Sequence, residues 1–451
     1  MTSSIVAYQD FKKDMRFDAE YYHTEKLNAE KNLQKFFYTI EENFTPIRKI
    51  EAIQSDNEYL VMDLENIVEN RIDDVKSLKG WEVGSTKKTI KKGDVIISRL
   101  RSYLKQIAIN YNYEKLLGST ECIVLRKKKD SRINKEVLFV ILLSNEVQNI
   151  LKWSQEGSNH PRFSQSLLCK IKIPIPSEIT QERIVELITK SNEYFILANR
   201  KYKEAERFLM TELGIQDFKV SSEKTNTIKY SDYKNSLRLD SRYYLPKYED
   251  TLQIINKSGY ETLTVSDILV EPIKSGATPL AGTNAYIEKD YGIPFFRIVN
   301  IKNYQLITED LLYIRPDIHK TTLKRSQIKP GDVLFSIAGT IGICAVVPET
   351  IKEGNINQAL AILRLKTDFN PYFVSIYFNS IIGRLISEKI SRPVVQSNLN
   401  LTELGTLKIP YFPKVTQNKI ASLVQECFKL RKEGEELIKN AVNEIENLIE
   451  T

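Results

Sequence analysis

Two halves of this sequence share one pattern of residues, and that internal repeat restricts the folds open to the chain. The opening of the first half returns in the second at a constant offset of 238 − 16 = 222 residues. The identical pairs are Tyr8 and Tyr230, Asp10 and Asp232, Lys12 and Lys234, Arg16 and Arg238, Asp18 and Asp240, Tyr21 and Tyr243, and Tyr22 and Tyr244. Identities at one ungapped register predict two similar structural units within the chain.

Three later pairs of segments extend the repeat toward the end of the chain. The matched segments are 92–98 with 330–336, 123–126 with 361–364, and 172–174 with 408–410. The first pair shares a Gly-Asp-Val motif at an offset of 331 − 93 = 238, so an insertion precedes this motif in the second copy. Residues 45–90 and 260–328 should therefore differ most between the copies.

Each copy ends with an Ile-Pro pair followed by a long helical pattern. The first long helix is expected from about Ser177 or Thr180 to Leu213, and apolar or small residues recur along it at alternating spacings of four and three. The seam residues are Ile184, Ile188, Ser191, Phe195, Ala198, Tyr202, Ala205 and Leu209 in the first helix, and Leu423, Cys427, Leu430, Gly434, Leu437, Ala441, Ile445 and Leu448 in the second. Two such narrow seams favour an antiparallel coiled coil. The alternative is an amphipathic helix packed on its own domain, for which a wider apolar stripe is typical.

The local patterns between these landmarks predict β-rich units that also contain helices. Strands are expected at 94–98, 333–337, 343–347 and 359–365, and helices at 137–151 and 372–386. The predicted fold is α+β: two β-rich mixed domains separated by two long helices in an antiparallel coiled coil, with a pseudo-twofold internal repeat. The expected boundaries are 1–176 for the first domain, 177–215 for a central spacer helix, 216–410 for the second domain and 411–451 for a distal spacer helix.

Composition permits a polyanionic partner without requiring one, because 65 Lys and Arg against 58 Asp and Glu give a formal charge of +7. The isolated residues Cys122, Cys169, Cys344 and Cys427 are expected as small buried side chains in a reduced compartment. The N-terminus does not resemble a signal peptide, and no apolar run approaches the roughly 20 residues of a membrane span. We therefore expect a soluble, cytoplasmic protein that does not contact a membrane.

Motifs of catalysis are missing from the sequence. His23, His160 and His319 are not spaced as metal ligands, and each is expected at a surface or loop position. Neither a phosphate-binding Gly-x-x-x-x-Gly-Lys loop nor a Gly-x-Ser-x-Gly motif is present. The segment 370–372, Asn-Pro-Tyr, is interpreted as an ordinary helix start rather than part of a methyltransferase site. We expect a chain without a catalytic or metal site of its own.

Basic and polar residues gather in the divergent segments and loops, where they could contact DNA phosphates and base edges. The candidates are Lys87, Lys88, Arg99, Arg101, Arg162, Gln165, Lys324, Arg325, Ser336, Thr340, Arg392, Gln396 and Asn398. Arg99 and Arg101 are favoured because they directly follow a strand whose motif occurs in both copies. A charge run is as often a solvated face. For Arg162, Gln165, Gln396 and Asn398, capping and turn formation are equally good interpretations.

Several motifs then occur together: Gly331-Asp-Val-Leu-Phe-Ser336 with Gly339-Thr-Ile-Gly342, Asn357-Gln358 before Leu363-Arg364, Gln396-Ser-Asn-Leu399, and the Ile-Pro exits at 173–176 and 409–413 followed by Gln181 and Gln417. In this combination the chain resembles the specificity subunit of type I restriction–modification systems over essentially its full length. The resemblance implies two target recognition domains, each of which reads half of a split double-stranded DNA sequence, and long helices that set their spacing.

The resemblance also implies partners. Two DNA methyltransferase subunits would dock on this chain, with S-adenosylmethionine held by them, and restriction translocase–nuclease subunits would join for cleavage. The first copy departs from the pattern, since Arg99-Leu-Arg101 stands opposite Ile337-Ala-Gly339 and Ser119-Thr120 opposite Asn357-Gln358. The target is therefore expected to be asymmetric.

Other functions remain open from the sequence alone. The chain could be the recognition subunit of a related restriction or phage-defence assembly, which neighbouring genes would distinguish. It could be a coiled-coil scaffold for proteins, which would lack the steep salt dependence of a DNA-binding protein. An enzyme with an unrecognised site is the weakest alternative, because histidines and paired catalytic motifs are scarce.

Overall fold

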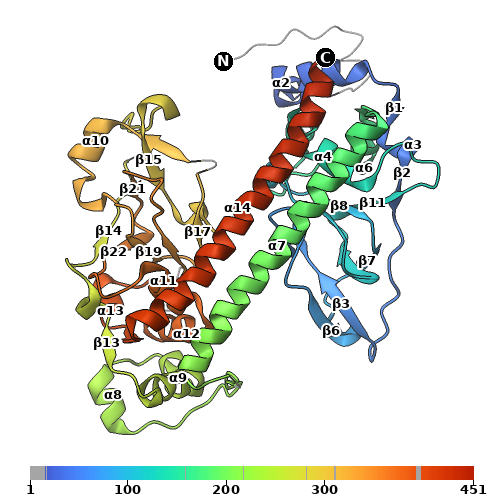
Figure 1. Ribbon diagram of the computed structural model, residues 1–451. Helices are drawn as coiled ribbons and strands as arrows, with labels where there is room; N and C mark the ends of the chain where they lie inside the picture. The colour runs from blue at the N-terminus through green and yellow to red at the C-terminus, as the bar shows by residue number, and fades with distance from the viewer. Residues whose placement is uncertain are drawn as a thin grey trace. The chain divides into compact units, whose positions relative to one another are not determined.

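A computed structural model describes residues 16, 18–157, 159–216, 218–280, 282–308, 311–392 and 398–451. The chain forms two compact units (Figure 1). Unit 1 comprises Met1–Phe195 and Lys432–Thr451, and unit 2 comprises Ile196–Arg431. The boundary between the units therefore falls inside both long helices. Tyr8, Asp10 and Lys12 of the first repeat opening lie outside the described residues.

Unit 1 contains two four-stranded sheets flanked by short helices. Its elements before the first long helix are α2 Thr24–Gln34, β1 Tyr38–Thr39, α3 Ile40–Asn43, β2 Phe44–Ile47, β3 Glu58–Met62, β4 Ile67–Val68, β5 Arg71–Ile72, β6 Lys76–Lys79, β7 Lys87–Lys91, β8 Val95–Ser98, β9 Ile107–Ile109, β10 Lys115–Ser119, β11 Cys122–Lys127, α4 Lys135–Leu143, α5 Asn145–Trp153, α6 Gln165–Lys170 and β12 Lys172–Ile173. One sheet has the order β2-β11-β8-β9 and the other β6-β3-β10-β7. Helix α4 packs its apolar residues against the first sheet, where the main core of the unit lies.

Unit 2 repeats this plan with a larger principal sheet. Its elements are α8 Tyr230–Ser236, α9 Pro246–Lys257, β13 Thr262–Thr264, β14 Lys274–Ser275, β15 Ile293–Phe296, β16 Ile301–Lys302, β17 Gln305–Leu306, β18 Leu312–Ile314, α10 Pro316–Lys320, β19 Val333–Ser336, β20 Cys344–Val346, β21 Asn355–Ile356, β22 Leu360–Leu363, α11 Pro371–Asn379, α12 Ile381–Ile390, α13 Leu401–Gly405 and β23 Lys408–Pro410. The sheets have the orders β14-β22-β19-β20-β17-β16 and β18-β15-β21.

The strand pairings repeat between the units. The antiparallel trio β11-β8-β9 of unit 1 corresponds to β22-β19-β20 of unit 2. Each unit also contains one parallel pair in its second sheet, β3 with β10 and β15 with β21. The expected internal repeat and the α+β class are therefore confirmed.

The helices expected at 137–151 and 372–386 are each two helices, so these two predictions were wrong. Ser144 separates α4 from α5, and Ser380 separates α11 from α12. Both serines have extended backbone angles, and their hydroxyls donate to carbonyls of the preceding turn, Ile141 O at 2.7 Å and Tyr377 O at 2.6 Å. Serine competes with the helix for backbone hydrogen bonds and favours N-cap positions, which explains both breaks.

The long helices α7 (Glu178–Glu212) and α14 (Lys414–Glu450) run antiparallel within each unit (Figure 1). In unit 1, Ser191 Oγ donates to Gly434 O at 2.8 Å, and Arg183 pairs with Glu444 at 3.1 Å. In unit 2, Lys201 pairs with Glu426 at 3.1 Å. Residue numbers rise along one helix as they fall along the other, so the antiparallel coiled coil is confirmed.

The residues proposed for the first seam are buried, whereas the second seam follows a slightly different line. Ile184, Ile188, Phe195, Tyr202 and Leu209 are all buried on α7. On α14 the buried residues are Gln417, Ile420, Ala421, Val424, Cys427, Leu430, Arg431, Gly434, Ala441, Ile445 and Ile449, while Leu423, Leu437 and Leu448 are only half-buried. Gly434 allows close packing, because a Cβ there would lie 3.0 Å from the Phe195 ring. Cys427, Leu430, Gly434, Ala441 and Ile445 thus lie on the buried line as expected, whereas the other three proposed residues lie beside it.

Two further expectations concern single residue types. All four cysteines are buried with free thiols, as predicted. His319 contradicts the surface expectation: it is buried in α10, and its Nδ1 lies within hydrogen-bonding distance of Asn355 Oδ1.

Asn370 caps α11 by accepting from Tyr372 N, which confirms the helix-start interpretation. Among the residues that the structure describes, no helix is both long and apolar enough to cross a bilayer.

Candidate nucleic-acid interface

An ion pair between a buried aspartate and a half-buried arginine fixes the strand that precedes the candidate loop in each unit. Gly93 and Gly331 adopt positive φ values of 87° and 82° in the turn that leads into β8 and β19. The next residue is a buried aspartate. Asp94 accepts from Arg126 Nη2 at 2.7 Å, and Asp332 accepts from Arg364 Nη2 at 2.7 Å. These hydrogen bonds raise the pKa of both guanidinium groups.

The loops that follow β8 and β19 share one left-handed position but carry different side chains. Arg101 has a φ of 50°, in the left-handed region that glycine favours. Its counterpart in unit 2 is Gly339, with a φ of 78°. An arginine that holds a conformation suited to glycine carries a steric cost, and such strain is concentrated at functional sites. The loop of unit 1 therefore holds Arg101 at some steric cost, as the same segment holds Lys105 at a φ of 47°.

In unit 1 four basic residues lie around this loop and one carboxylate. Arg162 donates to both oxygens of Glu121, at 2.9 and 3.1 Å, and Arg99 Nε lies 3.9 Å from the same carboxylate. Lys88 donates to Cys122 O at 2.7 Å, and burial lowers the pKa of its ammonium. Arg101 N donates to Pro161 O, so the segment that carries Arg162 is joined to the loop.

In unit 2 the corresponding loop carries neutral polar groups. Thr340 and Asn398 are exposed, and an isolated bridge joins Ala338 to Asn398. Arg392 is exposed and donates to Glu403 Oε1 at 3.2 Å through Nη2. Ser336 is buried, since its hydroxyl donates to Thr340 O at 2.6 Å and accepts from Ile343 N at 2.8 Å. Ser336 therefore shapes this turn.

The remaining residues that were proposed to contact DNA lie outside the loops that follow β8 and β19. Lys87 is buried in β7 and pairs with Asp63 at 2.5 Å. Lys324 and Arg325 are exposed on a short 3-10 helix, Lys324–Ser326. Gln165 is half-buried at the first position of α6. Gln396 lies outside the described residues.

The sequence matches the family described as type I restriction modification DNA specificity domain over residues 12–207 and 257–446. The chain belongs to this family. One matched stretch falls in each copy of the repeat, the second beginning after the opening motif at 230–244, and the resemblance seen in the sequence motifs is confirmed. Both regions of the match include the loops that follow β8 and β19.

Individual members of the family share short stretches with this chain. The specificity subunit of type I restriction enzyme EcoBI from Escherichia coli is 27% identical over 163 residues, which are 36% of this chain and 34% of that protein. The putative type I restriction enzyme MjaX specificity subunit from Methanocaldococcus jannaschii is 30% identical over 176 residues, 37% of this chain and 39% of that protein. These matches thus span less than half of each relative's length.

A solved structure also aligns with the chain. The type I restriction–modification S subunit from M. genitalium covers 90% of this chain and 95% of its own, at 13% identity and a TM-score of 0.42.

The sequence motifs did not identify the two carboxylates of the candidate interface, Glu121 and Glu403. Glu121 follows β10, and Glu403 lies in α13 on a different part of the repeat. Their positions are not equivalent in the two copies, so the repeat could not identify them. Their shared feature is a paired arginine, which only the fold brings together.

Proposed function

We propose that this chain reads DNA sequence for a type I restriction–modification assembly, and that each unit reads one half of a bipartite target. The observation that carries the proposal is the loop after β8 and β19. An equivalent Asp–Arg pair fixes its scaffold in each unit, while the exposed side chains differ. A rigid scaffold with variable polar groups is what base recognition requires.

The difference between the loops supports an asymmetric target. Unit 1 presents Arg99 and Arg101 where unit 2 has Ile337 and Gly339. Arginine reads guanine or binds phosphate, whereas the exposed Asn398 and Thr340 of unit 2 are suited to other base edges. The two halves of the target therefore have different sequences.

We also propose that two methyltransferase subunits dock on this chain, one on each copy of the repeat. Ile179 and Val415 support this, because they occupy equivalent positions at the starts of α7 and α14 and are 79% and 82% exposed. Repetition of a large exposed apolar side chain at equivalent positions favours two copies of one partner. S-adenosylmethionine would be held by those subunits and catalysis would take place there. Translocase–nuclease subunits would join for restriction.

Selection from a library of random double-stranded DNA tests the proposal. The purified full chain should enrich duplexes with two unlike short motifs at a fixed gap. Its affinity for an enriched duplex should fall steeply as salt rises, because phosphate contacts release counterions. A chain that enriches no motif, or whose binding is insensitive to salt, would contradict DNA reading.

Replacing Arg101 with glycine should separate stability from binding. We expect the free energy of unfolding of unit 1 to rise by up to about 1 kcal/mol, because glycine removes the steric cost of the left-handed conformation but has more unfolded-state entropy. Affinity for the selected duplex should fall about tenfold, the loss expected for one arginine contact to a base or phosphate. Urea unfolding and fluorescence anisotropy measure the two quantities.

Asp74→Gly is the matched control for this prediction. Asp74 is an exposed residue of unit 1 with a φ of 52°. Its replacement should give a smaller gain in stability, because aspartate tolerates the left-handed region better than arginine, and should not weaken DNA binding. If the Arg101→Gly variant binds DNA as tightly as the unchanged chain, Arg101 is not part of the interface.

A further inference from the structure

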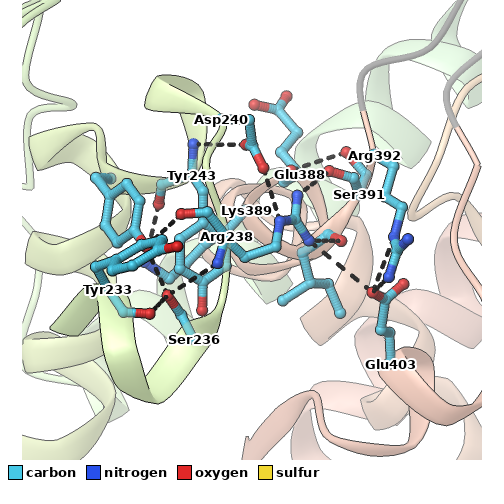
Figure 2. Close-up of polar contacts among 12 residues, drawn as sticks. Tyr233, Ser236, Arg238, Asp240, Tyr243, Glu388, Lys389, Ser391, Arg392 and Glu403 are labelled. Carbon is cyan, nitrogen blue, oxygen red and sulfur yellow. Dashed lines mark hydrogen bonds and ion pairs between the residues drawn. The ribbon is translucent and has the colours of Figure 1, made fainter. Parts of the chain in front are cut away.

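The opening motif of each copy of the repeat contains an arginine, Arg16 in unit 1 and Arg238 in unit 2, that binds main-chain carbonyls of its own unit. In unit 2, Arg238 lies among main-chain carbonyls at the end of α12 (Figure 2). Its Nη1 donates to Ile390 O at 3.2 Å and its Nη2 donates to Ser391 O at 3.1 Å. Asp240 accepts from Arg238 Nε at 2.7 Å, which fixes the orientation of the guanidinium.

The equivalent arginine of unit 1 makes the equivalent contact. Arg16 Nη2 donates to Gln155 O at 3.5 Å, and Gln155 is the counterpart of Ser391 at an offset of 391 − 155 = 236. Arg16 Nε donates to Asp18 at 3.2 Å, and its Nη1 donates to Glu156 at 2.8 Å. Both copies thus attach their opening motif to the same backbone position, although the intervening sequences differ.

A tyrosine retained in both copies supports each arginine from another side. Arg16 lies 4.3 Å from the centroid of the Tyr21 ring, and Lys26 Nζ lies 3.6 Å from it. In unit 2, Arg238 lies 4.9 Å and Lys389 Nζ 4.1 Å from the Tyr243 centroid. Cation–π contacts of this kind stabilise a guanidinium that is largely withdrawn from water.

The backbone that these arginines contact is joined by hydrogen bonds and bridges to the loops of the candidate interface. In unit 2, Arg392 N donates to Asn398 O at 3.1 Å, and Asn398 bridges to Ala338 in the loop after β19. The carboxylate of Glu403, which holds Arg392, is also 3.9 Å from Arg238 Nη1 (Figure 2). In unit 1, Glu156 and Arg162 exchange backbone hydrogen bonds of 2.8 and 2.9 Å, and Arg162 bridges to Leu100.

We propose that Arg16 and Arg238 are positioning residues, each of which fixes the reading segment of its own unit: residues 155–157 and 159–162 in unit 1, and residues 391–392 with Asn398 in unit 2. The arginines contact main-chain oxygens and so set where Arg162, Arg392 and Asn398 stand. Each arginine therefore controls the sequence discrimination of one half-site. This inference rests on the proposed function, since it assumes that these segments read DNA.

The test is the same selection from random duplexes, carried out with Arg16→Ala and Arg238→Ala in the full chain. Arg238→Ala should reduce discrimination in one half of the enriched motif roughly tenfold, as expected for lost hydrogen bonds from a charged donor. The other half should be unchanged, and Arg16→Ala should give the reverse pattern. An equal loss of discrimination in both halves of the motif, or no loss in either, would overturn the proposal. If the unchanged chain enriches no motif, the proposed function itself fails.

Hydrogen exchange in the free protein tests the same proposal without DNA. The amide of Arg392 should exchange faster in Arg238→Ala, while the amides of β19 and β22 keep their protection, because only the reading segment loses its anchor. Unchanged exchange at Arg392 would contradict the positioning role. Asp240→Asn serves if Arg238→Ala does not fold, and it should shift both measurements in the same direction.

Two control variants separate geometry from charge. Arg238→Lys keeps the positive charge but cannot donate to two carbonyls in a fixed fork, so it should restore little of the discrimination. Full recovery with lysine would show that charge alone acts there and would overturn the positioning role. Lys257→Ala removes one exposed positive charge from α9 of unit 2 and should leave the enriched motif unchanged. A loss of sequence discrimination in one half of the enriched motif with Lys257→Ala would also contradict the proposal.

Discussion

Asp332→Ala should lower the free energy of unfolding of unit 2 by about 2–3 kcal/mol, because it removes a buried carboxylate that accepts hydrogen bonds from a charged donor and from the backbone. Asp332 is only 2% exposed and accepts hydrogen bonds from Arg364 Nε at 2.8 Å and from Lys329 N at 2.8 Å. Alanine would leave the partly exposed Arg364 guanidinium with Glu271 as its carboxylate partner and would leave Lys329 N without its acceptor beside the core strand β19. The loss should therefore exceed that of an ordinary surface substitution.

The repeat supplies matched variants for this experiment. Asp94→Ala removes the same carboxylate from unit 1, and Asp290→Ala removes an exposed carboxylate from unit 2. Urea unfolding followed by hydrogen exchange should assign the loss to unit 2 for Asp332, to unit 1 for Asp94, and show a change within about 0.5 kcal/mol for Asp290. A loss below about 1 kcal/mol for Asp332→Ala would contradict the structural role of the pair.

Gln417→Ala should destabilise unit 2 by about 3 kcal/mol, because it removes three hydrogen bonds between a buried side chain and the backbone. Gln417 is fully buried near the start of α14. Its amide donates to Phe412 O at 2.8 Å and to Asp368 O at 3.1 Å, and its carbonyl accepts from Asn370 N at 2.8 Å. The side chain thus attaches the long helix to the segment before α11.

Gln181 is the matched position in unit 1. It donates to Arg132 O at 3.0 Å and accepts from Asn134 N at 3.2 Å, but it is half-buried. Gln181→Ala should therefore cost less than Gln417→Ala, since water can replace some of the lost bonds. Denaturant midpoints of the two variants measure the difference. Equal losses, or a larger loss at Gln181, would show that burial does not set the cost.

Much of the architecture could be predicted because the repeat tests each assignment twice. The Gly-Asp turns predicted β8 and β19, since only a few residue types suit a positive φ followed by a capping carboxylate. The helix breaks at Ser144 and Ser380 were missed, although the serines recur at equivalent positions. An apolar run hides such a break, because burial on all sides removes the usual amphipathic signal.

The candidate interface was less accessible to sequence reasoning. Arg99 and Arg101 were identified because they follow a repeated strand motif, and Arg162 because it precedes the Ile-Pro exit. The structure brings Arg99 and Arg162 together around Glu121, and Arg101 N donates to Pro161 O beside Arg162. Lys87 looked equivalent to them but is buried against Asp63. Charge alone cannot distinguish a lysine that faces solvent from one that pairs inside a sheet, because both occur in short basic runs.

Mapping of methylated bases tests the central claim most directly. The chain would be expressed with the methyltransferase subunit encoded in its own genome, in a host that lacks such modification, and methylated bases would be located by single-molecule sequencing. The account predicts methylation of one split motif, with two unlike halves at a fixed gap, only when this chain is present. A stable complex of the two proteins without new methylation, or methylation that does not depend on this chain, would contradict it.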